Sequence, residues 1–193
     1  NYHGSGMPVL SHQGRMFTTF ENALSPGVFL PGRRAVRGIT GIQSFVISIN
    51  EDDDLLDAEN WTISNHLDLG PKHVPIGWPE LEDLNWREGN VVVAPNGEIW
   101  SLMCVKAIPQ IEKAAILKVD PEGKQISFDP STGFIDFPGG MTRFIIRKDE
   151  ITGTYWTISN PNTCQAFINQ RNVLALYEST DLIKWDHRAT LIE

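Results

Sequence analysis

A β-hairpin is predicted by the stretch Val91-Val92-Val93-Ala94-Pro95-Asn96-Gly97-Glu98-Ile99-Trp100-Ser101-Leu102-Met103. Two apolar runs flank Asn96-Gly97, and this dipeptide favours a tight turn because both residues tolerate positive φ. Similar hairpins, with apolar runs on both sides of a turn cluster, are predicted in residues 8–17, 114–128 and 143–158. Helical periodicity is weak and limited to short pieces such as 54–60 and 79–84. An all-β, antiparallel fold is therefore expected.

The hairpins group in pairs, and each pair has the length of a four-stranded sheet. The three resulting units cover roughly residues 3–68, 86–133 and 134–193, with a Pro-rich connection over 69–85. A four-stranded antiparallel sheet that repeats along the chain is the blade of a β-propeller. Residues 1–193 are therefore expected to form a single domain of about three blades, which is part of a propeller.

Composition narrows the class of protein. A chain of 193 residues is long enough for one globular domain with a core, and its 41% hydrophobic and 21% charged residues are typical of such a domain. The net charge of −8 is spread along the chain, which argues against a nucleic-acid partner because phosphates need a basic surface. No apolar run reaches the roughly 18–20 residues of a membrane span. The chain starts at Asn1 without Met, which fits a processed or partial chain, and a secreted or periplasmic location is expected.

The two cysteines give no support for a metal site. Cys104 and Cys164 form no Cys-x-x-Cys pair and have no neighbouring His at ligand spacing, so neither a metal nor another cofactor is expected. Cys104 lies in the apolar run 101–105 and is predicted to be a buried thiol.

A motif near the end of the chain carries a family resemblance. In Ser179-Thr180-Asp181-Leu182-Ile183-Lys184-Trp185, the Ser and Asp side chains are suited to cap turn amides while the Trp fills the sheet beneath. The motif resembles the sialidase Asp-box (BNR repeat), Ser-x-Asp-x-Gly-x-x-Trp, one residue shorter and without its Gly. Four other strings are similar to strings of bacterial sialidase-like exo-glycosidases: Tyr2-His3, Glu88-Gly89-Asn90, 134–140 and 171–176.

The resemblance implies a fold and a function. Proteins of this kind have five or six blades, so this chain would supply about three, with the remaining blades in a missing part of the chain or in another subunit. They hydrolyse a terminal sugar at the central pocket, which implies a glycoside hydrolase with a carbohydrate or glycoconjugate as partner. The alternative is a propeller that binds carbohydrate without cleaving it.

Three residues are candidates for catalysis at the centre of the propeller, where the innermost strands begin. Glu88 is the first candidate for acid or base, because it stands where a strand enters the pocket; alternatively it only pairs with an Arg or a loop amide. Asp136 is the second, since apolar neighbours would raise its pKa, although it could instead brace the turn 138–140. Tyr2 is the third, because sialidases use a Tyr nucleophile paired with a Glu.

Six further residues are candidates for binding the sugar. Sialidases hold the substrate carboxylate with three arginines, because a guanidinium pairs with a carboxylate in a bidentate manner. The arginines available at inner-hairpin positions are Arg15, Arg143 and Arg171. The polar candidates beside them are His3, Asn90 and Asn172. Glu21 is expected to be a solvated residue at the rim.

Overall fold

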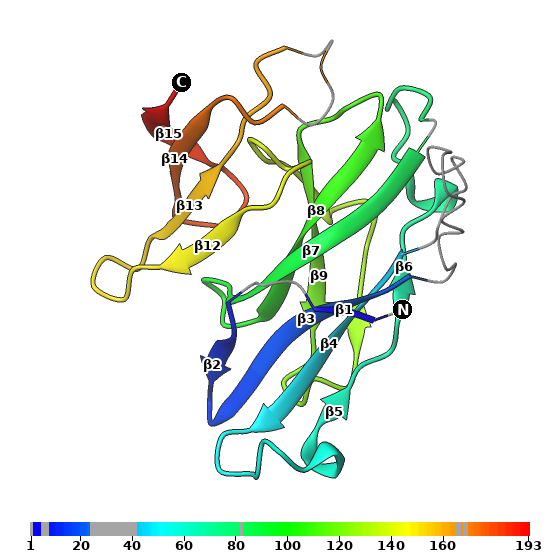
Figure 1. Cartoon of the computed structure of the whole chain (residues 1–193), viewed down its shortest axis with the longest axis vertical. Coiled ribbons are helices and arrows are strands. Elements are labelled where there is room, and N and C mark those ends of the chain that lie inside the picture. The colour runs from blue at the N-terminus through cyan, green and yellow to red at the C-terminus, as the bar shows by residue number, and fades with distance from the viewer. Residues whose placement is uncertain (1, 5–7, 24–41, 82, 165–166, 168–169) are drawn as a thin grey trace, which may run out of the picture.

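The computed structural model describes residues 2–4, 8–23, 42–81, 83–164, 167 and 170–193. These residues form three antiparallel sheets that lie side by side in chain order, as Figure 1 shows from blue through green to red. The helical elements among them are two 3-10 turns, η1 (Ala58–Asn60) and η2 (Pro71–His73). None of the helices in this part of the chain is long and apolar enough to cross a membrane. The prediction of an all-β, antiparallel fold is confirmed.

The first sheet contains β1 (Tyr2–Gly4), β2 (Leu10–His12), β3 (Arg15–Ala23), β4 (Ile42–Asn50), β5 (Thr62–Ile63) and β6 (Leu67–Asp68). Both β1 and β2 pair with β3, which pairs with β4, and both β5 and β6 pair with β4. The inner and outer edges of this sheet are therefore each built from two short strands.

The second sheet contains β7 (Asp83–Val93), β8 (Ile99–Ile108), β9 (Lys113–Val119), β10 (Ile126–Ser127) and β11 (Phe134–Asp136). The third contains β12 (Ile145–Lys148), β13 (Tyr155–Ser159), β14 (Leu174–Ser179) and β15 (Asp186–Ile192). The predicted bounds of the blades differ from these sheets at one junction. Residues 134–136 were assigned to the third unit, but β11 pairs with β9 and so completes the second sheet.

The second sheet is buried on both faces, and β8 shows this most clearly. On one face, Met103 and Val105 pack in a cluster with Phe17 of the first sheet. On the other face, Leu102 and Cys104 belong to a cluster that includes Phe144, just before β12, and Ile146 of β12. The predicted burial of Cys104 is confirmed, and this burial raises the pKa of its thiol. Consecutive sheets packed face to face in this way are the blades of a β-propeller.

A buried asparagine joins the second sheet to the third. The side chain of Asn90 is fully buried, its Nδ2 donates to the carbonyl of Phe144 at 3.0 Å, and its Oδ1 accepts from the N–H of Ile146 at 3.1 Å. Sugar binding by Asn90 stays a prediction, and in the structure both polar atoms of its amide are used between β7 and the segment 144–146.

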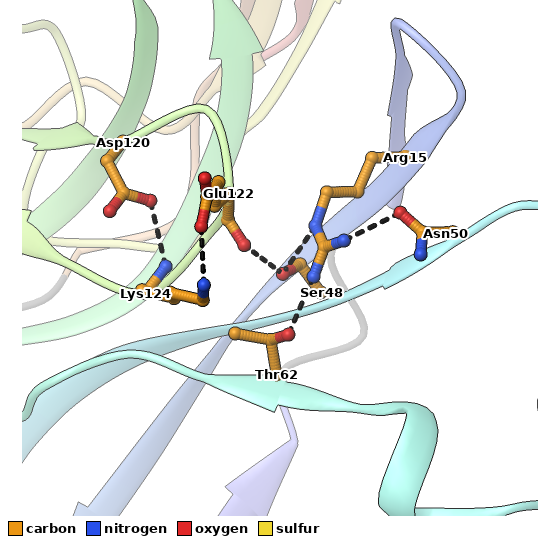
Figure 2. Close-up of polar contacts among 7 residues, drawn as sticks. All are labelled: Arg15, Ser48, Asn50, Thr62, Asp120, Glu122 and Lys124. Atoms are coloured by element: carbon orange, nitrogen blue, oxygen red, sulfur yellow. Dashed lines mark hydrogen bonds and ion pairs between the residues drawn. The ribbon is translucent and has the colours of Figure 1, made fainter.

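The first and second sheets meet at the turn between β9 and β10, which Figure 2 shows in detail. Ser48 of β4 donates from its hydroxyl to the carbonyl of Glu122 at 3.2 Å. A Cβ on Gly123 would lie 2.1 Å from the Ser48 hydroxyl, so the turn can approach β4 this closely only with glycine at this position. The ion pair between Lys124 and Glu122 closes the turn itself.

Arg15 belongs to this junction. Its Nε donates to the hydroxyl of Ser48 at 3.1 Å, and its two Nη groups donate to Asn50 and Thr62, each at 2.7 Å (Figure 2). The role of Arg15 as a ligand of a substrate carboxylate stays a prediction, and in the structure its guanidinium is held by β4 and β5 at the turn end of β3.

The hairpin between β14 and β15 has the capping pattern expected from its sequence. The hydroxyl of Ser179 accepts from the N–H groups of Asp181 and Leu182, and the Asp181 carboxylate accepts from the N–H groups of residues 183–184. Trp185 donates from Nε1 to the carbonyl of Leu182 at 3.2 Å. Leu182 takes the left-handed conformation, with φ of 65°, because its fully buried side chain packs against the second sheet.

The Asn90 bridge makes a prediction about stability. Asn90→Ala leaves the carbonyl of Phe144 and the N–H of Ile146 buried without these partners, which should lower the free energy of unfolding by about 2–4 kcal/mol. Urea denaturation followed by Trp fluorescence measures this loss. The control is Asn172→Ala, at an exposed position, where the change should stay within about 0.5 kcal/mol. Equal effects of the two substitutions would contradict the bridge.

The turn between β7 and β8 makes a prediction about acid stability. Hydrogen bonds from Lys118, Trp100 and Asn96, in that order of importance, lower the pKa of Glu98 from 4.5 to about 2. A carboxylate with a depressed pKa stabilises the folded state above its unfolded pKa, and this stabilisation is lost as the pH falls through the folded value. The free energy of unfolding should therefore decrease between pH 4.5 and about 2.

Two variants test this assignment. The decrease should be shallower in Glu98→Gln, which removes the titrating group, and in Lys118→Gln, which removes the largest cause of the shift. Chemical denaturation at a series of pH values gives the slopes. Slopes identical to wild type in both variants would show that other carboxylates carry the acid sensitivity.

Candidate functional site

A pocket of about 460 Å³ lies where the inner parts of the second and third sheets meet. Its lining residues are Arg87, Glu88, Lys106, Met141, Arg143 and Arg171. The first two belong to β7 and Lys106 to β8, whereas the others lie before β12 and in the loop between β13 and β14. Residues from four separate segments therefore converge on one hollow, as the propeller geometry predicts for strand entries.

A β-bulge turns Glu88 into this pocket. In the pairing of β7 with β8, Arg87 stands opposite Cys104 and Gly89 opposite Met103, so Glu88 is an extra residue without a partner in the ladder. A bulge interrupts the alternation of side chains along a strand and re-aims one of them. As a result, two consecutive residues, Arg87 and Glu88, line the same pocket.

Gly89 fixes the place of the bulge. A Cβ at this residue would lie 2.3 Å from the sulfur of Met103, 2.7 Å from the hydroxyl of Ser101 and 3.0 Å from Thr19. Because Thr19 belongs to β3, the first sheet also packs closely against β7 here. Only a residue without a side chain fits, so the position of Glu88 is set by packing between two blades.

An ion pair holds Glu88 in the pocket. Its Oε1 accepts from Nε of Arg143 at 2.8 Å, and the exposed fraction is 14% for the Glu88 side chain and 61% for that of Arg143. The hydrogen bond to Glu88, and after it the negative charge of Glu88, raise the pKa of the Arg143 guanidinium. Arg87 is oriented separately, because its Nε donates to Oδ1 of Asn85 at 3.0 Å.

The lining is strongly positive although the whole protein is acidic. Four cationic side chains, Arg87, Lys106, Arg143 and Arg171, and one carboxylate, Glu88, give a formal charge of four minus one, or +3. The complete chain carries a net charge of −8. A concave site with a local charge opposite to that of the molecule attracts anions and concentrates them.

Three of the predicted site residues meet in this pocket, and they are Glu88, Arg143 and Arg171. Two of the three arginines named in the sequence analysis, Arg143 and Arg171, therefore line the same pocket. The third, Arg15, does not line it, and the other cations there are Arg87 and Lys106. Asn172 is exposed and lies next to Arg171, outside the lining. His3 is described only by its backbone, which stands opposite Glu21 in the pairing of β1 with β3.

Asp136 is not among the residues that line this pocket, and its catalytic role stays a prediction. It ends β11 at the outer side of the second sheet, where its side chain is 91% exposed and forms an ion pair with Lys113 at 2.6 Å. The apolar neighbours that suggested a buried setting, Ile135 and Phe137, are themselves buried. Side chains alternate along a strand, so burial of residues 135 and 137 directs Asp136 to solvent.

Tyr2 is also not among the lining residues of the pocket, and its role as nucleophile stays a prediction. Its side chain is 71% exposed, and its ring contacts Phe45 edge-on with 5.8 Å between centroids. In the pairing of β1 with β3 it stands opposite Asn22, on the face that carries Phe20 and Phe45. This face lies opposite the one that packs on the second sheet.

Two residues near the site were missed or misplaced by the sequence analysis. Lys106 lines the pocket, and the signal for it is a lone cation in the apolar run 102–108 of β8. Glu21 was expected at a solvated rim, but it is 3% exposed. It stands opposite Ser44, whose hydroxyl contacts the sulfur of Met103 at 3.6 Å, so it faces the second sheet near the bulge.

Comparison with known proteins shows the fold. No family model matches the sequence, and no curated protein matches it. The chain is similar to Trypanosoma rangeli sialidase in complex with the inhibitor DANA, with a TM-score of 0.51 and 13% identity, over 93% of this chain and 27% of that chain. It is also similar to the exo-inulinase from Aspergillus awamori, with a TM-score of 0.54 and 13% identity, over 97% of this chain and 37% of that one.

Both proteins are glycoside hydrolases with a β-propeller, and the chain spans well under half the length of either. The protein therefore has the fold of a glycoside hydrolase propeller, and its three sheets correspond to part of such a propeller. Within residues 2–4, 8–23, 42–81, 83–164, 167 and 170–193, no group of three His, Cys, Asp or Glu side chains is arranged to hold a metal ion.

The close approach at Gly89 makes a prediction about the pocket. Gly89→Ala should destabilise the fold by about 1–3 kcal/mol, because the added methyl must displace Met103 or Thr19. The matched control is Gly70→Ala, where the nearest atom to the new Cβ is 3.9 Å away. Thermal denaturation measures both variants. A neutral effect at Gly89 would show that the two sheets are less tightly packed than described.

Proposed function

We propose that the protein is a sialidase-like exo-glycosidase that acts on a terminal sugar carrying an acidic group. The observation that carries the proposal is the pocket at the strand entries, with a formal charge of +3 around a single carboxylate. A carboxylate-bearing sugar matches this charge pattern, whereas a neutral sugar would leave several cations without a counter-charge. The propeller fold shared with two glycoside hydrolases is consistent with it.

The roles of the lining residues follow from their geometry. Arg171 and Lys106 bind the acidic group of the sugar, since both line the pocket and neither forms an ion pair with a carboxylate in the part of the chain that the structure describes. Glu88 transfers the proton during cleavage, because it is the carboxylate of the lining and its side chain is largely buried. Arg143 holds the Glu88 carboxylate in place through its hydrogen bond.

Cleavage also needs a second group, either a nucleophile or an activated water. The lining contains one carboxylate, so the partner of Glu88 comes from outside these lining residues. The remaining blades of the propeller are the proposed source. We also propose that the hairpin 179–185 is a variant Asp-box in which Leu182 takes the left-handed position.

A propeller that binds acidic sugar without cleaving it is the second candidate. The ion pair between Glu88 and Arg143 favours this second candidate. A carboxylate that is fixed by a guanidinium can orient the cations of the pocket without transferring a proton. The two candidates share the same ligand and differ only in the release of product.

The test is Glu88→Gln, assayed with an aryl glycoside of N-acetylneuraminic acid and with a neutral aryl galactoside. Glu88→Gln should lower kcat on the acidic substrate by about 100-fold or more, because a positioned proton-transfer group contributes a factor of this size. The exposed Glu59 offers a control, and Glu59→Gln should keep wild-type activity. Full activity of Glu88→Gln would remove Glu88 from the mechanism. Binding of the acidic sugar by calorimetry without any turnover in wild type would support the binding propeller.

A further inference from the structure

The four cations that line the pocket around Glu88, which we call the charged pocket, are held in two different ways. Arg87 and Lys106 belong to the long strands β7 and β8. Arg143 stands in the segment before β12, and Arg171 stands in the connection between β13 and β14. The first pair is placed by the strand ladder, whereas the second pair is placed by contacts between loops.

The segment 138–142, which leads to β12, runs along the junction of the second and third sheets. Pro138 lines a hollow of about 660 Å³ at the outer side of this junction, which we call the outer hollow. Met141 lines the charged pocket. Between them, the carbonyl of Gly140 accepts from the N–H of Val105 in β8 at 2.9 Å. The segment therefore crosses from one hollow to the other along the second sheet.

Glu112, directly before β9, bonds to this segment and to the next one. Its Oε2 accepts from the N–H of Gly139 and also from the N–H of Asn162, the latter at 3.5 Å. Its Oε1 accepts from Nε2 of Gln110 at 2.9 Å. One carboxylate oxygen of the second sheet thus joins the segment 138–142 to the connection between β13 and β14.

The two segments that meet at Glu112 are the ones that carry the loop cations. Gly139 precedes Arg143 in the first segment, and Asn162 precedes Arg171 in the second. Two guanidinium groups that line one pocket repel each other, so their segments need a fixed anchor. A carboxylate is a stronger acceptor for backbone N–H groups than a neutral carbonyl, which suits Glu112 to this task.

A second hydrogen bond joins the same two segments at the end of β13. The hydroxyl of Ser159 donates to the carbonyl of Pro138 at 2.6 Å. Asn162 lies beyond this point, where the connection has left the strand ladder. Glu112 therefore anchors the part of the connection that Ser159 does not reach.

We infer that Glu112 is a positioning residue of the charged pocket. It holds the segments of Arg143 and Arg171 on the second sheet and thereby sets the affinity of the pocket for an anion. Glu112 lines the outer hollow and not the charged pocket, so it acts through these two segments. The inference rests on the anion binding in the proposed function and not on the cleavage of a bond.

Hydrogen exchange of the ligand-free protein tests the anchor. Glu112→Ala should speed the exchange of amides in residues 160–164 by about 10-fold, because the N–H of Asn162 loses its acceptor. Glu112→Gln keeps a neutral oxygen acceptor and should speed it by no more than about 3-fold. Glu150→Ala, at an exposed position in the turn between β12 and β13, is the control and should match wild type. Unchanged exchange of residues 160–164 in Glu112→Ala would overturn the inference.

Anion binding gives a readout that a loss of stability alone would not move. Inorganic phosphate is titrated while the side-chain NMR signals of Arg143 and Arg171 are followed, which gives the Kd of the folded protein. Glu112→Ala should raise this Kd by about 10-fold, and Glu112→Gln by no more than about 3-fold. The same Kd in Glu112→Ala and wild type would overturn the inference. A wild type that binds no phosphate would overturn both the inference and the proposed class of ligand.

Turnover separates the role of Glu112 from that of Glu88. With the acidic aryl glycoside, Glu112→Ala should raise KM by about 10-fold and keep kcat within about 2-fold, because weaker binding alone acts on KM. A loss of kcat at unchanged KM in this variant would contradict the positioning role. If wild type shows no turnover while the phosphate Kd shifts as expected, the proposed reaction fails and the inference stands.

Discussion

Burial of the second sheet on both faces is the constraint on which the rest of the structure depends. β8 contributes alternate side chains to two separate clusters, with Met103 and Val105 on one side and Leu102 and Cys104 on the other. Each buried aliphatic side chain is worth about 1.5–3 kcal/mol relative to exposure, so a strand that is apolar on both faces demands a partner sheet on each. The three blades are stacked in chain order because this demand is met by the sheets before and after it.

The same close packing creates the candidate site. Where β7 meets β3 there is no room for a Cβ, and the residue at this position is Gly89, which has none. The bulge beside it displaces Glu88 from the ladder and directs it into the pocket, next to cations from β8 and from the loops of the third sheet. The position of Glu88 in the pocket is therefore a consequence of how closely two blades approach at Gly89.

Two asparagine side chains between the blades each form two hydrogen bonds to backbone groups. Asn90 and Asn65 each bind the backbone of a neighbouring sheet or turn through both atoms of an amide, Asn90 at residues 144–146 and Asn65 at Ile126. Arg15 instead forms its hydrogen bonds within the first sheet, to the side chains of Ser48, Asn50 and Thr62. The two asparagines align sheets that apolar packing alone would let slide, since apolar contacts have little directionality. Arg171 and Lys106 line the charged pocket instead.

The sequence by itself determined the hairpins, the antiparallel class and the capped turn at 179–185, because turn residues and alternation act over a few neighbouring positions. It also nominated Glu88, Arg143 and Arg171, which line one pocket, although Glu88 lies within β7 and reaches the pocket through the bulge. Only the tertiary structure decided the rest. Asp136, Arg15 and Asn90 occupy equally suggestive positions in the chain, but their surroundings depend on which strand pairs with which and on how the blades abut. Residues 134–136 pair with β9 instead of opening the next blade, and a single change of partner moves a carboxylate from the centre of the propeller to its outer edge.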